Sequence, residues 1–187
     1  MSQPVQDVRV TEKQVEVSGC LTDTFSIDHY TKVGNKDSSS HTKCDAHTVI
    51  LFIPGNPGAA GWYINMLKEV IEKLGKGYAA RAVSYAGHGV CPIVVGSGID
   101  KSHIAWTVDG QIQHKMDWIE NMEQEFNTSM PKFIWISHSI GSFMVQRLLV
   151  LRKDFLVRTR SVIHLMPFFR YDPYPKWKEK LLSFVAR

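Results

Sequence analysis

One serine in this sequence has the neighbours that could make it a nucleophile. Ser139 is the centre of residues 137–141, Ser-His-Ser-Ile-Gly, between an apolar strand-like stretch and an apolar helix-like stretch. Small residues two positions on either side permit the sharp strand-to-helix turn that exposes a nucleophile for acyl transfer. Gly141 meets this requirement, whereas Ser137 stands where glycine is usual. Serine is also a common N-cap, so the motif alone leaves both roles open.

A serine nucleophile needs two backbone amides that stabilise the negative charge on the attacked carbonyl oxygen. The first is the amide of Ile140, at the positive end of the helix that follows the serine. The second is expected in the 54–58 loop, Pro-Gly-Asn-Pro-Gly, which comes directly after an apolar run. Asn56 is the natural donor, because the preceding glycine lets the backbone turn and Pro57 has no amide hydrogen. A plain tight turn is the alternative for this loop.

The elements that must position these residues alternate between strands and helices. Residues 13–20 and 24–30 alternate apolar and polar side chains, which predicts an antiparallel pair at a sheet edge. Further strands are expected at residues 48–53, 78–84, 132–136 and 159–165, and helices at residues 62–74, 109–126 and 143–150. This order predicts a single α/β domain over residues 1–187, with a mostly parallel sheet and helices on both faces.

Composition agrees with a folded domain and excludes several classes of protein. The 187 residues are 44% hydrophobic and 21% charged, which is enough for a buried core. The net charge of +4 comes from dispersed basic residues, which argues against nucleic-acid binding. No stretch approaches the roughly 18 apolar residues of a membrane-spanning helix, and no secretory signal is visible, so any membrane contact is expected to be peripheral. The three cysteines lack metal-site spacing and are expected to be reduced.

Four separated motifs resemble the lipid droplet-associated hydrolase family of α/β-hydrolases. They are residues 53–58 followed by Tyr63, residues 87–89, residues 109–115 and residues 138–141. The resemblance covers about residues 45–170. It implies an α/β-hydrolase fold, a Ser-Asp-His triad with Ser139 as nucleophile, and hydrolysis of neutral lipid or sterol esters in lipid storage and turnover. It also implies a location on the cytosolic side of lipid droplets and endoplasmic reticulum.

The sequence departs from the family after the nucleophile. In this fold the acid and the histidine of the triad follow the serine along the chain, and each further strand-crossover-strand unit takes about 30 residues. Within 187 residues, two further strands and the triad histidine do not fit after Ser139, and residues 171–187 resemble the start of a lid. We therefore expect a sheet that lacks its last strands, an open apolar edge and a poor catalyst.

No residue within the sequence is a convincing substitute for the absent triad members. Asp172 precedes a proline and fits a turn better than a catalytic acid. Other roles are expected nearby: a hydrogen-bonded sheet position for His164, a structural position pointing away from Ser139 for His138, loop shaping for His88, and packing for His114 and Lys115. No metal or cofactor is expected, because the remaining histidines lack ligand spacing: His29, His41, His47 and His103.

Three functions remain open from the sequence. The first is a serine ester hydrolase of lipid droplets. The second is a non-catalytic protein that binds a droplet or membrane surface through the aromatic and basic residues 171–187, for which an ordinary lid helix is the alternative. The third is a hydrolase of soluble acyl esters or thioesters, because the fold does not determine the substrate.

Overall fold

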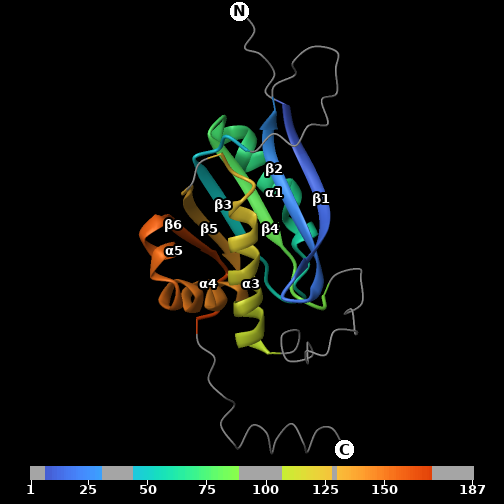
Figure 1. Ribbon diagram of the computed structural model, residues 1–187, viewed down its shortest axis with the longest axis vertical. Helices are drawn as coiled ribbons and strands as arrows, with labels where there is room; N and C mark the ends of the chain where they lie inside the picture. The colour runs from blue at the N-terminus through green and yellow to red at the C-terminus, as the bar shows by residue number, and fades with distance from the viewer. Residues whose placement is uncertain (1–6, 31–43, 89–106, 128–129, 170–187) are drawn as a thin grey trace, which may run out of the picture.

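A six-stranded sheet organises the chain. The computed structural model describes residues 7–30, 44–88, 107–127 and 130–169, and its strands have the order β1-β2-β4-β3-β5-β6 (Figure 1). The strands are β1 (Asp7–Val17), β2 (Cys20–Tyr30), β3 (Thr48–Ile53), β4 (Tyr78–Val83), β5 (Lys132–His138) and β6 (Thr159–Leu165). β2 is antiparallel to β1 and β4, whereas β4, β3, β5 and β6 are parallel to one another.

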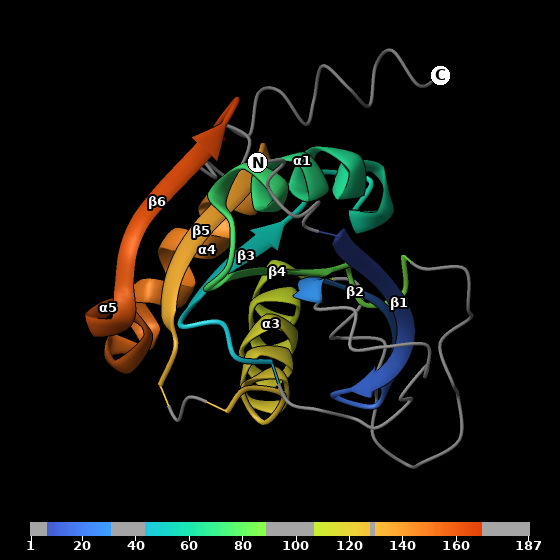
Figure 2. The same ribbon diagram turned by 90° about the horizontal axis from the view of Figure 1, so that it is seen from above.

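Helices cover both faces of this sheet. The 3-10 turn η1 (Ala60–Tyr63) and α1 (Ile64–Leu74) lie on one face, and α3 (Val108–Glu123) lies on the other (Figure 2). α4 (Ile140–Leu151) and α5 (Lys153–Arg158) pack on the α3 face. In β3, Phe52 packs into the core beneath α1, whereas Leu51 packs into the core beneath α3 and α4. Burial on both faces explains why the sequence of β3 is continuously apolar.

Most of the predicted elements are confirmed, and the differences have local causes. β3 and β6 coincide with the predicted strands. β1 begins earlier than predicted, at Asp7, and ends at Val17, so the prediction of residues 18–20 in the first strand is wrong. Residues 18 and 19 form the turn, and β2 begins at Cys20, also earlier than predicted. The helix expected to reach Phe126 ends at Glu123, since Phe126 is buried and forms a β-bridge with Cys44. α5 was not predicted, because six residues are too few to show a helical period.

Some features named above lie outside the described residues. These are Cys91, His41, His103, Asp172 and residues 171–187. Cys20 and Cys44 are reduced thiols, as predicted, and burial raises the pKa of Cys44 to about 11. No helix in the described ranges has both the length and the apolar character needed to cross a membrane.

β6 forms one edge of the sheet, and it is apolar and exposed. Within the described residues no strand pairs with its outer side. Val162 and Ile163 are 38% and 44% exposed, and Met166 and Phe169 after the strand are 78% and 49% exposed. These exposures agree with the apolar edge expected from the sequence. Such an edge is a site at which further chain or another molecule can pair.

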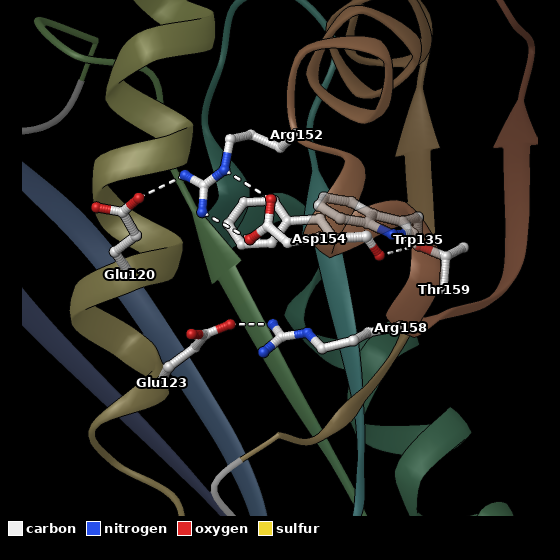
Figure 3. A network of polar contacts seen from close by, with 8 residues as sticks. Glu120, Glu123, Trp135, Arg152, Asp154, Arg158 and Thr159 are labelled. Atoms are coloured by element: carbon white, nitrogen blue, oxygen red, sulfur yellow. Dashed lines mark hydrogen bonds and ion pairs between the residues drawn. The ribbon is translucent and has the colours of Figure 1, made fainter.

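Two arginines, one before α5 and one at its end, form ion pairs with α3 (Figure 3). Arg152 forms an ion pair with Glu120, and its side chain is 27% exposed. Arg158 forms an ion pair with Glu123, and its side chain is only 7% exposed. The guanidinium of Arg158 also lies 4.2 Å from the centroid of the Phe133 ring. Both contacts hold α3 against the half of the sheet that carries the turn at Ser139.

Candidate active site

Ser139 lies at the turn between β5 and α4 in a conformation that side chains rarely adopt. Its φ is 50° and its ψ is −124°. A positive φ of this kind costs a non-glycine residue about 1–3 kcal/mol, so the surrounding contacts must hold it. Its N–H donates to the carbonyl of Leu165 at 3.0 Å, and its carbonyl accepts from the amides of Ser142 and Phe168 at 3.0 and 3.1 Å. The predicted strand, sharp turn and helix are therefore confirmed.

The side chain of Ser139 does not cap α4. The residue occupies the N-cap position, but its hydroxyl makes no hydrogen bond to the first turn. Thr107 shows the contrast at α3, where its hydroxyl accepts from the amide of Gly110 at 3.0 Å. The capping alternative is therefore wrong. The nucleophile role stays a prediction, now for a half-buried residue that borders a cavity.

Glycines allow the turn and the 54–58 loop to meet. A Cβ on Gly141 would lie 2.5 Å from the carbonyl oxygen of Pro54, and a Cβ on Gly55 would lie 2.4 Å from Nδ1 of His138. Real Cβ atoms do not approach other atoms so closely. A small residue is therefore required at position 141, because the start of α4 directly contacts the end of β3 there.

The three predicted site residues line one cavity of about 410 Å³, namely Ser139, Asn56 and Ile140. Asn56 is exposed, and the other two are half-buried. The rest of the described lining comes from four segments of the fold, namely the loop after β4, the start of α3, α4 and the residues after β6: Tyr85, His88, Thr107, Val108, Gln111, Met144 and Phe168. No carboxylate, lysine or arginine occurs in this described lining. The cavity thus combines apolar walls with a few polar groups, as small-molecule sites commonly do.

Ser137, which replaces the usual glycine, is fully buried and hydrogen-bonded. Its hydroxyl lies 2.6 Å from Nδ1 of His164 on β6 and donates to the hydroxyl of Ser142 at 3.3 Å. The extra oxygen therefore joins β5 to its neighbours instead of crowding the turn. The prediction of a hydrogen-bonded sheet position for His164 is confirmed. Burial lowers the pKa of His164, which favours its neutral form.

The other two histidines near the turn contact η1 and the 54–58 loop. Nδ1 of His138 lies 3.0 Å from the hydroxyl of Tyr63, which confirms its structural position. Nδ1 of His88 donates to the carbonyl of Pro57 at 2.8 Å, so its predicted loop-shaping role is also confirmed. Neither these histidines nor any other described residue makes a hydrogen bond to the hydroxyl of Ser139. In the described ranges, no cluster of three potential metal-binding side chains occurs.

Sequence reasoning missed a buried polar network behind the cavity. Lys115 is fully buried, and burial lowers its pKa well below the ordinary value. Its ammonium nitrogen is 3.1 Å from Nδ1 of His114, whose pKa burial and the lysine charge lower to about 2. The signal was present in the sequence, because Gln111 and Lys115 are one turn apart among the apolar residues of α3. Packing was predicted for His114 and Lys115, but not their hydrogen-bond partners.

Comparison with known proteins gives the family. Residues 46–171 match the sequence profile of the lipid-droplet associated hydrolase family. The chain belongs to this family. A lipid droplet-associated hydrolase from Gallus gallus is 28% identical over 146 residues, and one from Homo sapiens is 24% identical over 154 residues. These alignments cover 75% and 77% of this chain but 43% and 44% of the relatives, so the chain spans less than half of their length.

Solved structures confirm the predicted α/β-hydrolase fold for this family member. The S-formylglutathione hydrolase of Staphylococcus aureus aligns with a TM-score of 0.62 and 10% identity, over 100% of this chain and 74% of that one. At this identity the likeness concerns the fold alone. All four motifs of the lipid droplet-associated hydrolase resemblance lie within the matched residues.

Proposed function

We propose that this protein is a serine ester hydrolase with Ser139 as its nucleophile. The observation that carries the proposal is the positive φ of Ser139 at a turn whose hydroxyl borders the same cavity as Asn56 and Ile140. The side chain of Ser139 does not cap α4, so capping does not explain the strained backbone at this residue. Such strain is usually retained at functional sites. Membership of a family whose curated relatives are named hydrolases supports the same chemistry.

The chemistry would proceed in two steps. The oxygen of Ser139 attacks the ester carbonyl carbon, and the carbonyl electron pair moves to its oxygen, where the amides of Asn56 and Ile140 donate hydrogen bonds. Collapse of this intermediate expels the alcohol, which takes up a proton, and water then releases the acid from the serine ester. The serine proton needs a base. Since no described residue bonds to the hydroxyl, we infer that the base comes from outside the described residues.

The proposed substrates are neutral lipid or sterol esters, and the proposed location is the cytosolic side of lipid droplets and endoplasmic reticulum. Two observations support this choice. The described cavity lining carries apolar side chains such as Met144 and Phe168 and no carboxylate, lysine or arginine, which suits an uncharged acyl group. The curated relatives are named for lipid droplets.

A non-catalytic protein of droplet or membrane surfaces is the second candidate. The exposure of Met166 and Phe169, 78% and 49%, favours it, because exposed apolar side chains can enter a lipid surface. Among the described residues the hydroxyl of Ser139 has no hydrogen-bond partner, which agrees with this candidate as well. It differs from the first in needing no reactive serine.

Covalent labelling separates the two candidates. A fluorophosphonate probe is applied to the full-length protein, to Ser139→Ala and to the control Ser161→Ala, whose serine is exposed on β6. We expect labelling of the first and third proteins and none of the second. No labelling of the full-length protein discards the hydrolase, and droplet flotation that persists in Ser139→Ala then supports the surface-binding protein. Faster turnover of emulsified sterol esters than of soluble acyl esters and thioesters is expected, and the reverse order contradicts the lipid substrate.

A further inference from the structure

Two side chains of α3 form hydrogen bonds to the backbone of the loop that follows β4 and lines the cavity. Nε2 of Gln111 donates to the carbonyl of Ala86 at 2.9 Å, and the amide of Ala86 donates to Oε1 of Gln111 at 3.0 Å. Lys115 donates to the carbonyl of Ser84 at 3.0 Å and to Oε1 of Gln111 at 3.2 Å. Gln111 and Lys115 are four residues apart on one helix, so both side chains point to the same place.

The three hydrogen-bond partners of Lys115 favour its ammonium form, against the effect of burial, which lowers its pKa. Thr22 has one hydroxyl hydrogen, and it donates to the carbonyl of Cys20 at 3.2 Å. Nε2 of His114, 2.9 Å from the same hydroxyl, must therefore donate, which leaves Nδ1 of His114 as an acceptor for Lys115. With the two acceptors named above, Lys115 faces three acceptors, and only the ammonium form has three hydrogens. These bonds offset the cost of burying the charge.

Tyr85 connects this buried charge to the 54–58 loop. Its ring centroid lies 4.9 Å from the nitrogen of Lys115. Its hydroxyl donates to the carbonyl of Pro54 at 2.7 Å, and its backbone amide donates to the carbonyl of Gly58 at 2.9 Å. Burial raises the pKa of Tyr85, so the hydroxyl keeps the proton that it donates. Both ends of the loop are thus bonded to one residue, whose neighbours on either side are bonded to α3.

We propose that Lys115 is a positioning residue that acts through Tyr85 to fix the 54–58 loop beside Ser139. Lys115 does not border the cavity, so it has no direct contact with a substrate there. A lysine is required because an apolar side chain would fill the space but leave the carbonyl of Ser84 and Nδ1 of His114 without this donor, and Oε1 of Gln111 with only the amide of Ala86. The effect on turnover rests on the proposed ester hydrolysis, whereas the effect on the loop does not.

Hydrogen exchange tests the positioning without any need for turnover. The variants are Lys115→Met, Tyr85→Phe, which removes one oxygen and keeps the ring, and the control Tyr78→Phe at the start of β4. We expect the amides of the 54–58 loop to exchange about ten-fold faster in the first two variants than in the control, because each loses hydrogen bonds that anchor the loop. Unchanged exchange in Tyr85→Phe overturns the proposal. Faster exchange in Tyr85→Phe alone overturns the part assigned to Lys115.

Kinetics of the full-length protein then separate positioning from general destabilisation. We expect kcat for ester hydrolysis to fall about ten-fold or more in Lys115→Met and in Tyr85→Phe with KM nearly unchanged, because small displacements of a reacting group reduce turnover strongly. The double variant should be no slower than the slower single variant, since both act on one loop. If the losses in kcat of the two single variants multiply in the double variant, the proposal that Lys115 acts through Tyr85 is overturned. Absence of turnover in the unaltered protein contradicts the proposed function, and the exchange result still decides the positioning.

Discussion

Replacing Gly141 by alanine tests the packing that brings the start of α4 to the end of β3. The added Cβ would lie 2.5 Å from the carbonyl oxygen of Pro54 and 2.6 Å from that of Ile53. Ordinary van der Waals contact begins near 3.4 Å, so one backbone segment must move by about 0.9 Å. Both atoms belong to the backbone of a buried strand and its loop, which cannot rotate away as a flexible side chain can.

Two opposing effects set the magnitude for Gly141→Ala. Alanine is favoured over glycine inside a helix by about 1 kcal/mol. Overpacking of a buried site costs about 1–3 kcal/mol, and more where backbone must move. We therefore expect a net loss of about 1–2 kcal/mol in the free energy of unfolding, measured by urea denaturation. We also expect slower fluorophosphonate labelling of Ser139, because the displaced helix carries the amide of Ile140 with it.

The control is Gly61→Ala in η1, where the new Cβ would meet Cζ of Phe25 at 3.4 Å, an ordinary contact. This change should leave the free energy of unfolding within about 0.5 kcal/mol of the unaltered protein, or raise it slightly. Gly141→Ala that is as stable as Gly61→Ala would refute the close approach of α4 to β3. A stable Gly141→Ala with normal labelling would also remove the structural argument for a small residue at this position.

Other changes follow from the buried polar groups. Burial and the charge of Lys115 lower the pKa of His114 from 6.5 to about 2 in the folded protein. The contribution of neutral His114 to the free energy of unfolding is therefore complete above pH 6.5 and is lost as pH falls below it, by up to about 1.4 kcal/mol per pH unit. His114→Asn should flatten this dependence on pH in urea denaturation at several pH values, and an equal slope contradicts the assignment. Glu123→Gln should cost about 2–4 kcal/mol, because it leaves a buried guanidinium without its carboxylate, whereas Glu120→Gln should cost under about 1 kcal/mol; equal losses in thermal unfolding contradict this ranking. Ser137→Ala should lower the free energy of unfolding by about 1 kcal/mol, whereas Ser161→Ala, at an exposed position, should leave it nearly unchanged. Thermal unfolding measures both, and no difference between the two variants means that the buried hydroxyl of Ser137 contributes nothing to stability.

Much of the fold follows from local sequence patterns. Residues 48–53 are continuously apolar, and the structure buries β3 on both faces. The helix predicted to end at residue 74 does end there, and Gly75 stands at the C-cap of α1 with a φ of 77°. These features depend on the residues themselves and their nearest neighbours, so the sequence contains the information. α5 and the end of α3 could not be predicted, because they depend on the burial of Phe126 and of Phe155 against distant segments.

The candidate site divides in the same way. The residue types and spacing around Ser139, and the proline on one side of Asn56, were enough to name the nucleophile and the two amides as candidates. They could not separate a nucleophile from an N-cap, because serine performs both roles. The tertiary structure decided against the cap, since the hydroxyl of Ser139 makes no hydrogen bond to the first turn of α4.

Sequence alone therefore determined the order of strands and helices and the residues with the right chemistry, because hydrophobic period and turn chemistry act over a few neighbouring residues. Only the tertiary structure decided which polar groups meet. Ser137 and His164 are 27 residues apart, and Lys115 and the carbonyl of Ser84 are 31 residues apart. Such pairs form where strands and helices from different parts of the chain pack together, and no local pattern records which carbonyl a buried ammonium will face.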